Sequence, residues 1–159
     1  MQIQILTVGK LKEKYLVEAV QEYQKRLTAY AKITLREVKD EKVPDYASAA
    51  EEAAVLRKEA SRLEPLIRPG TCLIALAIQG KMYSSCEFAR YLEKSGVNGK
   101  SDLTFLVGGS LGLAPHLIDR ADLILSFSPM TFPHQLFRVL LLEQLFRAFK
   151  IIRNEPYHK

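Results

Sequence analysis

Small and conformationally special residues follow three apolar runs of the chain, and these are the residues best suited to hold a ligand. They form three segments: residues 79–81 after TCLIALAI, residues 108–112 after LTFLV, and residues 126–133 after LIL. Glycine lets a backbone approach a ligand closely and frees its polar groups to bind it. Each loop alone could be an ordinary turn. Three together, at the carboxyl ends of strands, predict a ligand site at one edge of a sheet.

The middle segment also fits the pattern G-x-S-x-G, in which Ser110 would be a nucleophile. Candidate partners follow it in the order of an α/β-hydrolase: Asp119 or Asp122, then His134 or His158. A nucleophile elbow needs a helix directly after the serine, whereas Gly112 and Pro115 delay the expected helix by about five residues. A serine hydrolase is therefore the third-ranked hypothesis, which fluorophosphonate labelling of Ser110 would revive. The loop fits neither dinucleotide-binding nor P-loop spacing.

No metal site is expected, because the histidines show no ligand spacing with one another or with the cysteines. The residues concerned are His116, His134, His158, Cys72 and Cys86. Cationic and aromatic groups gather instead near the C-terminus, where Arg147 and Arg153 precede Tyr157 and His158. Groups of these kinds can hold a phosphate backbone and a base. Composition alone would favour a disordered end for this tail.

Strands and helices that alternate along the chain must position these residues. Apolar periodicity and turn residues predict strands at residues 3–8, 33–38, 71–78, 103–107 and 123–127, with residues 79–81 breaking the third strand. Helices are predicted at residues 11–30, 48–67, 84–94, 115–121 and 133–153. The alternation predicts an α/β fold, a mostly parallel sheet with helices on both faces. We expect one domain over residues 1–159, since no linker or repeat divides the chain.

The last helix, residues 133–153, is apolar almost all round. A surface helix would show one apolar stripe, so this helix must be covered on several sides. In so small a domain a second subunit is the economical cover, and we expect a homodimer. A central helix in a monomer is the alternative.

The composition is that of a globular protein, with 48% hydrophobic and 26% charged residues. A net charge of +5 permits a polyanionic partner without requiring one. No signal peptide and no membrane span are expected, and we expect a cytoplasmic location.

Several motifs in order also resemble a known family. They are VGKLKEKY near the N-terminus, IQGK, LVGGSLGL, LSFSPMTFPHQLFRVLLLEQLFRAFKI and a terminal YHK. Together they resemble the bacterial ribosomal RNA large-subunit methyltransferase H family, a minimal member of the SPOUT class of knotted methyltransferases. The resemblance covers essentially the whole chain.

The resemblance implies an enzyme that uses S-adenosylmethionine to methylate N3 of a pseudouridine in 23S ribosomal RNA on the assembled ribosome. It also implies a homodimer and a C-terminal trefoil knot. The family's cofactor-binding positions fall here on Leu76, Gly108, Phe127, Ser128, Pro129, Met130, Thr131 and Phe132.

The C-terminal residues then take catalytic roles as a hypothesis. His158 would accept the N3 proton, Arg147 or Arg153 would stabilise negative charge on the base, and Tyr157 would stack on or bond to it. In the family the tail of one subunit reaches the cofactor of the other. A ribosome- or RNA-binding protein without catalysis is the alternative, and calorimetry with S-adenosylmethionine would separate the two.

Overall fold

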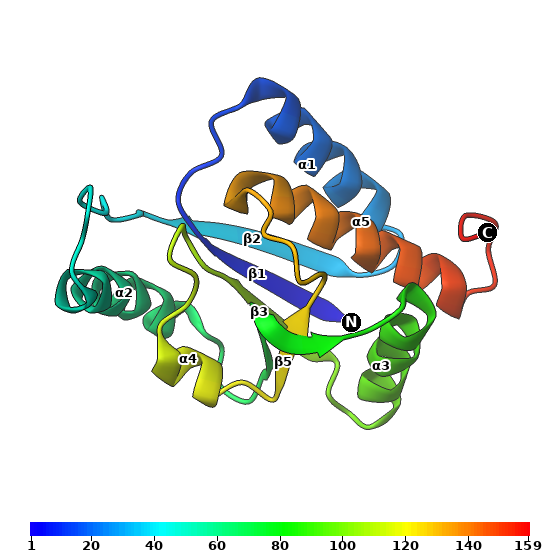
Figure 1. Cartoon of the computed structure of the whole chain (residues 1–159). Helices are drawn as coiled ribbons and strands as arrows, with labels where there is room; N and C mark the ends of the chain where they lie inside the picture. The colour runs from blue at the N-terminus through cyan, green and yellow to red at the C-terminus, as the bar shows by residue number, and fades with distance from the viewer.

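The computed structural model describes residues 1–159 and is built on one five-stranded sheet (Figure 1). The strands are β1 (Gln2–Val8), β2 (Lys32–Val38), β3 (Cys72–Met82), β4 (Asp102–Val107) and β5 (Leu123–Ser126). They lie in the order β2-β1-β4-β3-β5, and every neighbouring pair is parallel. The predicted mostly parallel sheet is confirmed and is parallel throughout.

The helices are α1 (Lys14–Leu27), α2 (Ala49–Leu63), α3 (Ser85–Val97), α4 (Pro115–Asp119) and α5 (His134–Ile152). Capping boxes begin two of them. The side chain of Ser48 accepts from the Glu51 N–H before α2, and Ser84 does the same with Glu87 before α3. After α2 a 3-10 turn, η1 (Glu64–Leu66), carries Pro65, which cannot donate a helical hydrogen bond.

The helices cover both faces of the sheet, as predicted (Figure 1). Buried residues of α1, α3 and α5 share a core with Ile3 and Ile5 of β1, on one face. Buried residues of α2 and α4 share a second core with Leu6 and Val8, on the other. Successive side chains of a strand point to opposite faces, so a strand covered on both sides needs an unbroken apolar sequence. None of the helices has the combination of length and hydropathy that a bilayer span requires.

The third strand is longer than predicted: residues 79–81 do not break it, and β3 continues to Met82. Its register with β5 shifts, so that Leu76 and Lys81 both pair with Leu125. Gly80 permits this crossing, because a Cβ atom there would lie 2.7–2.8 Å from backbone atoms of Leu125 and Ile124. A glycine read from sequence as a strand breaker instead marks a close approach of two backbones.

Gly80→Ala is expected to lower the free energy of unfolding by about 1–3 kcal/mol, since the added methyl group forces two strand backbones apart. Urea unfolding measures this change. Gly96→Ala is the matched control: it lies within α3, its Cβ would be an ordinary 3.5 Å from the Met1 side chain, and alanine favours helix. Equal stability of the two variants would contradict the prediction.

The last helix lies on the sheet between α1 and α3, which cover its flanks (Figure 1). The chain itself therefore buries much of the apolar surface for which the sequence predicted a second subunit. A strip of α5 remains half-exposed, and the half-exposed apolar residues of the helix are Leu136, Phe137, Val139, Leu140, Ile151 and Ile152. The homodimer thus remains a prediction, now confined to this strip.

Candidate active site

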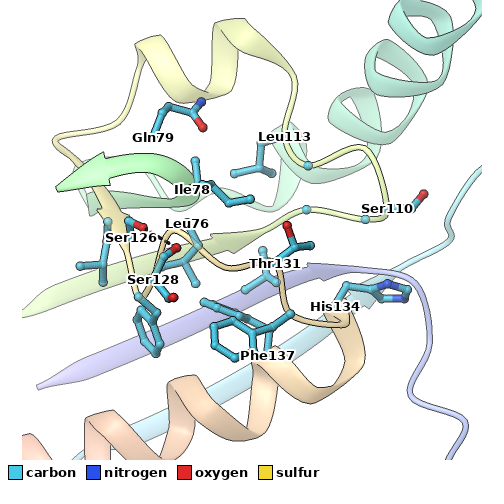
Figure 2. Close-up of a pocket in the computed structure, with 18 of the residues that line it drawn as sticks. Leu76, Ile78, Gln79, Ser110, Leu113, Ser126, Ser128, Thr131, His134 and Phe137 are labelled. Atoms are coloured by element: carbon cyan, nitrogen blue, oxygen red, sulfur yellow. Dashed lines mark hydrogen bonds between the residues drawn. The ribbon is translucent and has the colours of Figure 1, made fainter. Parts of the chain in front are cut away.

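A cavity of about 720 Å³ opens where β4 and β5 end, beside residues 76–79 in the middle of β3 (Figure 2). The three segments that sequence patterns singled out contribute to its wall, together with the first turn of α5. Its size lies within the range of small-molecule sites. The parallel sheet brings these segments together because all its strands end at the same edge.

The glycine loop forms one wall and folds back on itself. Gly112 donates its N–H to the Gly109 carbonyl at 3.1 Å, and its φ of +81° suits only glycine well. A Cβ atom on Gly108 would lie 2.2 Å from the Gly112 carbonyl group, so no other residue fits there. This closure leaves the N–H groups of Ser110 and Leu111 without a protein acceptor. Those groups are free to donate to a bound ligand.

The segment between β5 and α5 forms an aromatic wall. The rings of Phe127 and Phe137 have centroids 4.8 Å apart, and Phe132 lies 6.2 Å from Phe137. A serine turn orders the backbone here: the Ser128 hydroxyl accepts from the Met130 N–H at 3.0 Å, and its carbonyl accepts from the Ser126 hydroxyl at 3.2 Å. The wall presents flat apolar surfaces beside backbone polar groups.

Most of the predicted cofactor residues line this cavity: Leu76, Gly108, Phe127, Ser128, Met130, Thr131 and Phe132. Pro129 is not among the lining residues. Their contact with a cofactor stays a prediction. Sequence reasoning missed Phe137, which was assigned only to an apolar helix. The sequence did contain a clue to its role: Phe137 lies one helical turn after Pro133, and this position places it beside the segment between β5 and α5.

At the rim, α5 carries two residues that join the cavity to the end of β1. Arg138 is only 1% exposed, donates to the carbonyls of Val8 and Gly9 at 3.0 and 2.7 Å, and forms an ion pair with Glu37. Burial lowers the pKa of Arg138, and its ion pair opposes this shift. Burial and the charge of Arg138 also lower the pKa of His134. His134 is therefore a neutral imidazole near pH 7.

Ser110 is an exposed residue at the rim of the cavity, and its side chain points outward (Figure 2). α4 begins at Pro115, five residues later, so the loop is no nucleophile elbow. Neither candidate histidine bonds to Ser110: His134 stands at the rim of the cavity beside Gly9, and His158 lies beside Arg147. The geometry does not support the serine hydrolase hypothesis.

A cluster on the C-terminal half of α5 gathers three of the four predicted catalytic residues. Arg147 donates to Glu143 Oε1 from Nε and Nη2, at 3.0 and 2.6 Å. Its Nη1 lies 3.3 Å from His158 Nδ1, and its guanidinium lies 4.7 Å from the Tyr157 ring centroid. The Tyr157 hydroxyl donates to the same Glu143 oxygen at 3.2 Å. We call Glu143, Arg147, Tyr157 and His158 the tail cluster.

Glu143 is the member of the tail cluster that sequence reasoning missed. Its carboxylate raises the pKa of Arg147 and holds both the guanidinium and the Tyr157 hydroxyl. The available signal was the four-residue spacing of Glu143 and Arg147, which places the two side chains together on a helix face. The tail is thus ordered by specific contacts, against the disordered end that composition favours.

The Tyr157 hydroxyl is expected to ionise late, with a pKa of about 12. Burial raises the value first, and the neighbouring Tyr23 hydroxyl and Glu143 carboxylate raise it further. Glu143→Gln removes a negative charge that opposes the phenolate, so we expect the pKa of Tyr157 to fall toward the ordinary value of about 10. Ultraviolet difference titration, with Tyr157→Phe to assign the signal, measures it. An unchanged titration in Glu143→Gln would contradict the proposed contact.

Arg153 stands apart from the other three predicted catalytic residues. Its guanidinium lies over the Tyr30 ring, 4.7 Å from the centroid, and its Nη2 lies 3.5 Å from the Ala29 carbonyl. None of the four lines the large cavity. A second cavity of about 370 Å³ shares Phe127 and Phe132 with the first and reaches Ser85 and Gln144, beside the tail cluster. Within one chain the tail cluster therefore lies outside the wall of the large cavity and approaches Phe127 and Phe132 only through the second cavity.

Comparison with known proteins identifies the family. A family model described as a predicted SPOUT methyltransferase matches residues 1–158. A ribosomal RNA large subunit methyltransferase H of Desulforamulus reducens is 57% identical over 157 residues, 99% of this chain and 98% of the relative. One from Listeria welshimeri is 56% identical over the full length of both chains. The chain belongs to this family of SPOUT methyltransferases.

The family membership agrees with the fold. The crystal structure of a probable methyltransferase from Bordetella pertussis covers 92% of this chain and 95% of its own, with a TM-score of 0.56 and 15% identity. SPOUT membership also implies a knotted C-terminal part. The resemblance that sequence motifs suggested is thereby confirmed.

Proposed function

We propose that the protein transfers a methyl group from S-adenosylmethionine to N3 of a pseudouridine in 23S ribosomal RNA, on the assembled ribosome in the cytoplasm. The observation that carries the proposal is the pairing of two features in a member of the SPOUT methyltransferase family. One is a cavity suited to a nucleoside at three strand ends, and the other is an ordered cluster of Arg, Tyr and His on the last helix.

The residues of the cavity fit such a cofactor. Its volume of about 720 Å³ lies within the range of ligand sites. Leu76 and the aromatic wall can enclose an adenine ring, while the free N–H groups of Ser110 and Leu111 can donate to polar groups of the ligand. When bound, S-adenosylmethionine supplies an electrophilic methyl group.

The tail cluster can supply the rest of the chemistry. N3 of the base must lose a proton as it gains a methyl group. His158 can accept that proton, because an unprotonated imidazole nitrogen acts as a general base. Arg147 stabilises the negative charge left on the base, and Tyr157 provides a ring face for stacking. Glu143 positions both residues.

We propose a homodimer in which the tail cluster of one subunit completes the cavity of the other. The separation of the two sets within one chain supports this arrangement. The half-exposed strip of α5 offers apolar surface for the contact. Arg153, held at Tyr30, contacts neither set in one chain, and we assign it a role only if the dimer brings it to the base.

Two measurements test the function. Calorimetry should detect S-adenosylmethionine binding to the isolated protein, and absence of binding would favour an RNA-binding protein without catalysis. Mass spectrometry of ribosomal RNA nucleosides should find a methylated pseudouridine in cells with the protein and none in cells without it. An unchanged nucleoside profile would refute the proposed substrate.

A further inference from the structure

The loop between β1 and α1, residues 9–13, is held rigidly at the rim of the cavity. The Arg138 guanidinium donates hydrogen bonds to the carbonyl groups of Val8, at the end of β1, and Gly9, at 3.0 and 2.7 Å. Further on, the Leu11 N–H donates to Glu37 Oε1 at 3.0 Å, and the Lys12 N–H donates to Gln135 Oε1 at 3.2 Å. The backbone at Val8, Gly9, Leu11 and Lys12 is thus tied to side chains of β2 and α5.

The rim position follows from the residues that hold the loop. Gln135 is the second residue of α5, and its neighbour His134 lines the cavity. His134 Nε2 lies 3.6 Å from the position that a Cβ on Gly9 would take. In Figure 2, His134 stands at the edge of the pocket and points toward the segment that leaves β1. The loop and the cavity therefore share one edge.

Lys10 and Lys12 project from this fixed backbone as exposed side chains. Neither has a carboxylate within ion-pair distance, whereas Lys14, the next lysine, pairs with Glu18 at 3.8 Å. Two more exposed and unpaired lysines, Lys39 and Lys42, follow β2 at the same edge of the sheet.

The acidic groups nearby form no ion pair with these lysines. Glu37 is engaged by Arg138, and Asp40 faces Gly9 and contributes to the field at His134. Glu13 is exposed on the same loop. Asp45 and the buried Glu59 beside Gly109 also lack an ion-pair partner, but none of these carboxylates forms an ion pair with Lys10, Lys12, Lys39 or Lys42.

An exposed aromatic ring completes the surface. Tyr15 lies in the first turn of α1, directly after the loop, and is 66% exposed. Lysines along a groove bind phosphates, while exposed rings provide faces on which unpaired bases stack. The combination of cations and an aromatic ring beside a base-sized cavity favours an RNA strand with unpaired nucleotides over a lipid surface.

We propose that Lys10 and Lys12 bind backbone phosphates of the ribosomal RNA that flank the target base, with Tyr15 as a stacking face. This inference rests on the proposed function, since it places the RNA strand at the mouth of the same cavity. The bonds to the backbone hold the Cα positions of both lysines in advance, so only their side chains must become ordered on binding. Recognition by a chain of this size then depends on the shape of the ribosomal site as well as on charge.

The test uses ribosomes from a strain that lacks the protein. Their affinity for wild type and for the double variant Lys10→Ala/Lys12→Ala is measured at several potassium chloride concentrations. We expect the double variant to bind roughly tenfold more weakly and the slope of log affinity against log salt to decrease in size by about 1–2, as for two lost phosphate contacts. Affinity for S-adenosylmethionine, measured by calorimetry, should not change. Tyr15→Ala should weaken binding without altering the salt slope.

Lys32→Ala/Lys94→Ala is the matched control. It removes the same charge from exposed positions at the start of β2 and the end of α3, away from the cavity. Wild-type affinity of Lys10→Ala/Lys12→Ala, or an equal loss in both double variants, would overturn the proposal. The proposal would also be overturned if Lys10→Ala/Lys12→Ala lost binding to phosphatidylglycerol vesicles but bound ribosomes like wild type, since the lysines would then serve a lipid surface. If wild type binds ribosomes through these lysines but transfers no methyl group, the proposed function is wrong, while the proposal that Lys10 and Lys12 bind ribosomal RNA is supported.

Discussion

Deletion of residues 157–159 is expected to lower the rate of methyl transfer at least a hundredfold and to leave the affinity for S-adenosylmethionine unchanged. The deletion removes Tyr157 and the proton acceptor His158, and a positioned acid or base contributes about 10²–10⁴-fold. Affinity should persist because none of these residues lines the cavity. Single-turnover transfer to ribosomes and calorimetry measure the two quantities. His158→Ala alone should reproduce most of the loss.

Mixed dimers provide the sharper control. A subunit without residues 157–159 is combined with a subunit that carries Gly108→Ala in its cavity. If the tail acts on the partner's cavity, one intact site forms in each mixed dimer and transfer returns. Each tail could instead act on the cavity of its own subunit, by way of the second cavity beside the tail cluster. In that case the mixture stays inactive. Full activity of the deletion variant by itself would show that the tail has no part in the reaction.

Gly108→Ala is expected to weaken cofactor binding by at least a hundredfold. The added methyl group would lie 2.2 Å from the carbonyl carbon and oxygen of Gly112. These backbone atoms cannot move away without opening the loop. Opening displaces the free N–H groups of Ser110 and Leu111 that we expect the cofactor to use. Calorimetry with S-adenosylmethionine measures the loss, and circular dichroism reports whether the sheet remains folded.

Gly96→Ala is again the matched control, because its Cβ meets only the end of the Met1 side chain, at 3.5 Å. It should bind S-adenosylmethionine like wild type. If Gly108→Ala also binds like wild type, the loop is not the cofactor wall. A folded Gly108→Ala protein with weak binding separates loss of the site from loss of the fold.

The local pattern of the sequence determined the sheet and its helices. β1 was predicted because its residues alternate and then turn apolar, and β3 and β4 because they are apolar runs, as expected of strands covered on both faces. The helix starts predicted at residues 48 and 84 agree with the caps Ser48 and Ser84 of α2 and α3, because capping uses contacts within three residues. The three small-residue segments predicted the cavity because parallel strands end at one edge. The family resemblance added the cofactor positions, of which only Pro129 lies outside the wall.

Tertiary structure alone decided the features that depend on distant segments. The crossing of β3 over β5 at Gly80 could not be read from a motif, because a glycine breaks a strand or permits a close contact according to its neighbours in space. Glu143 became part of the tail cluster only when the chain end folded back onto α5. The loop around Lys12 became a rim of the cavity through bonds to Arg138 and Gln135, more than a hundred residues away. Sequence spacing determines local contacts, while only packing determines which loops share an edge.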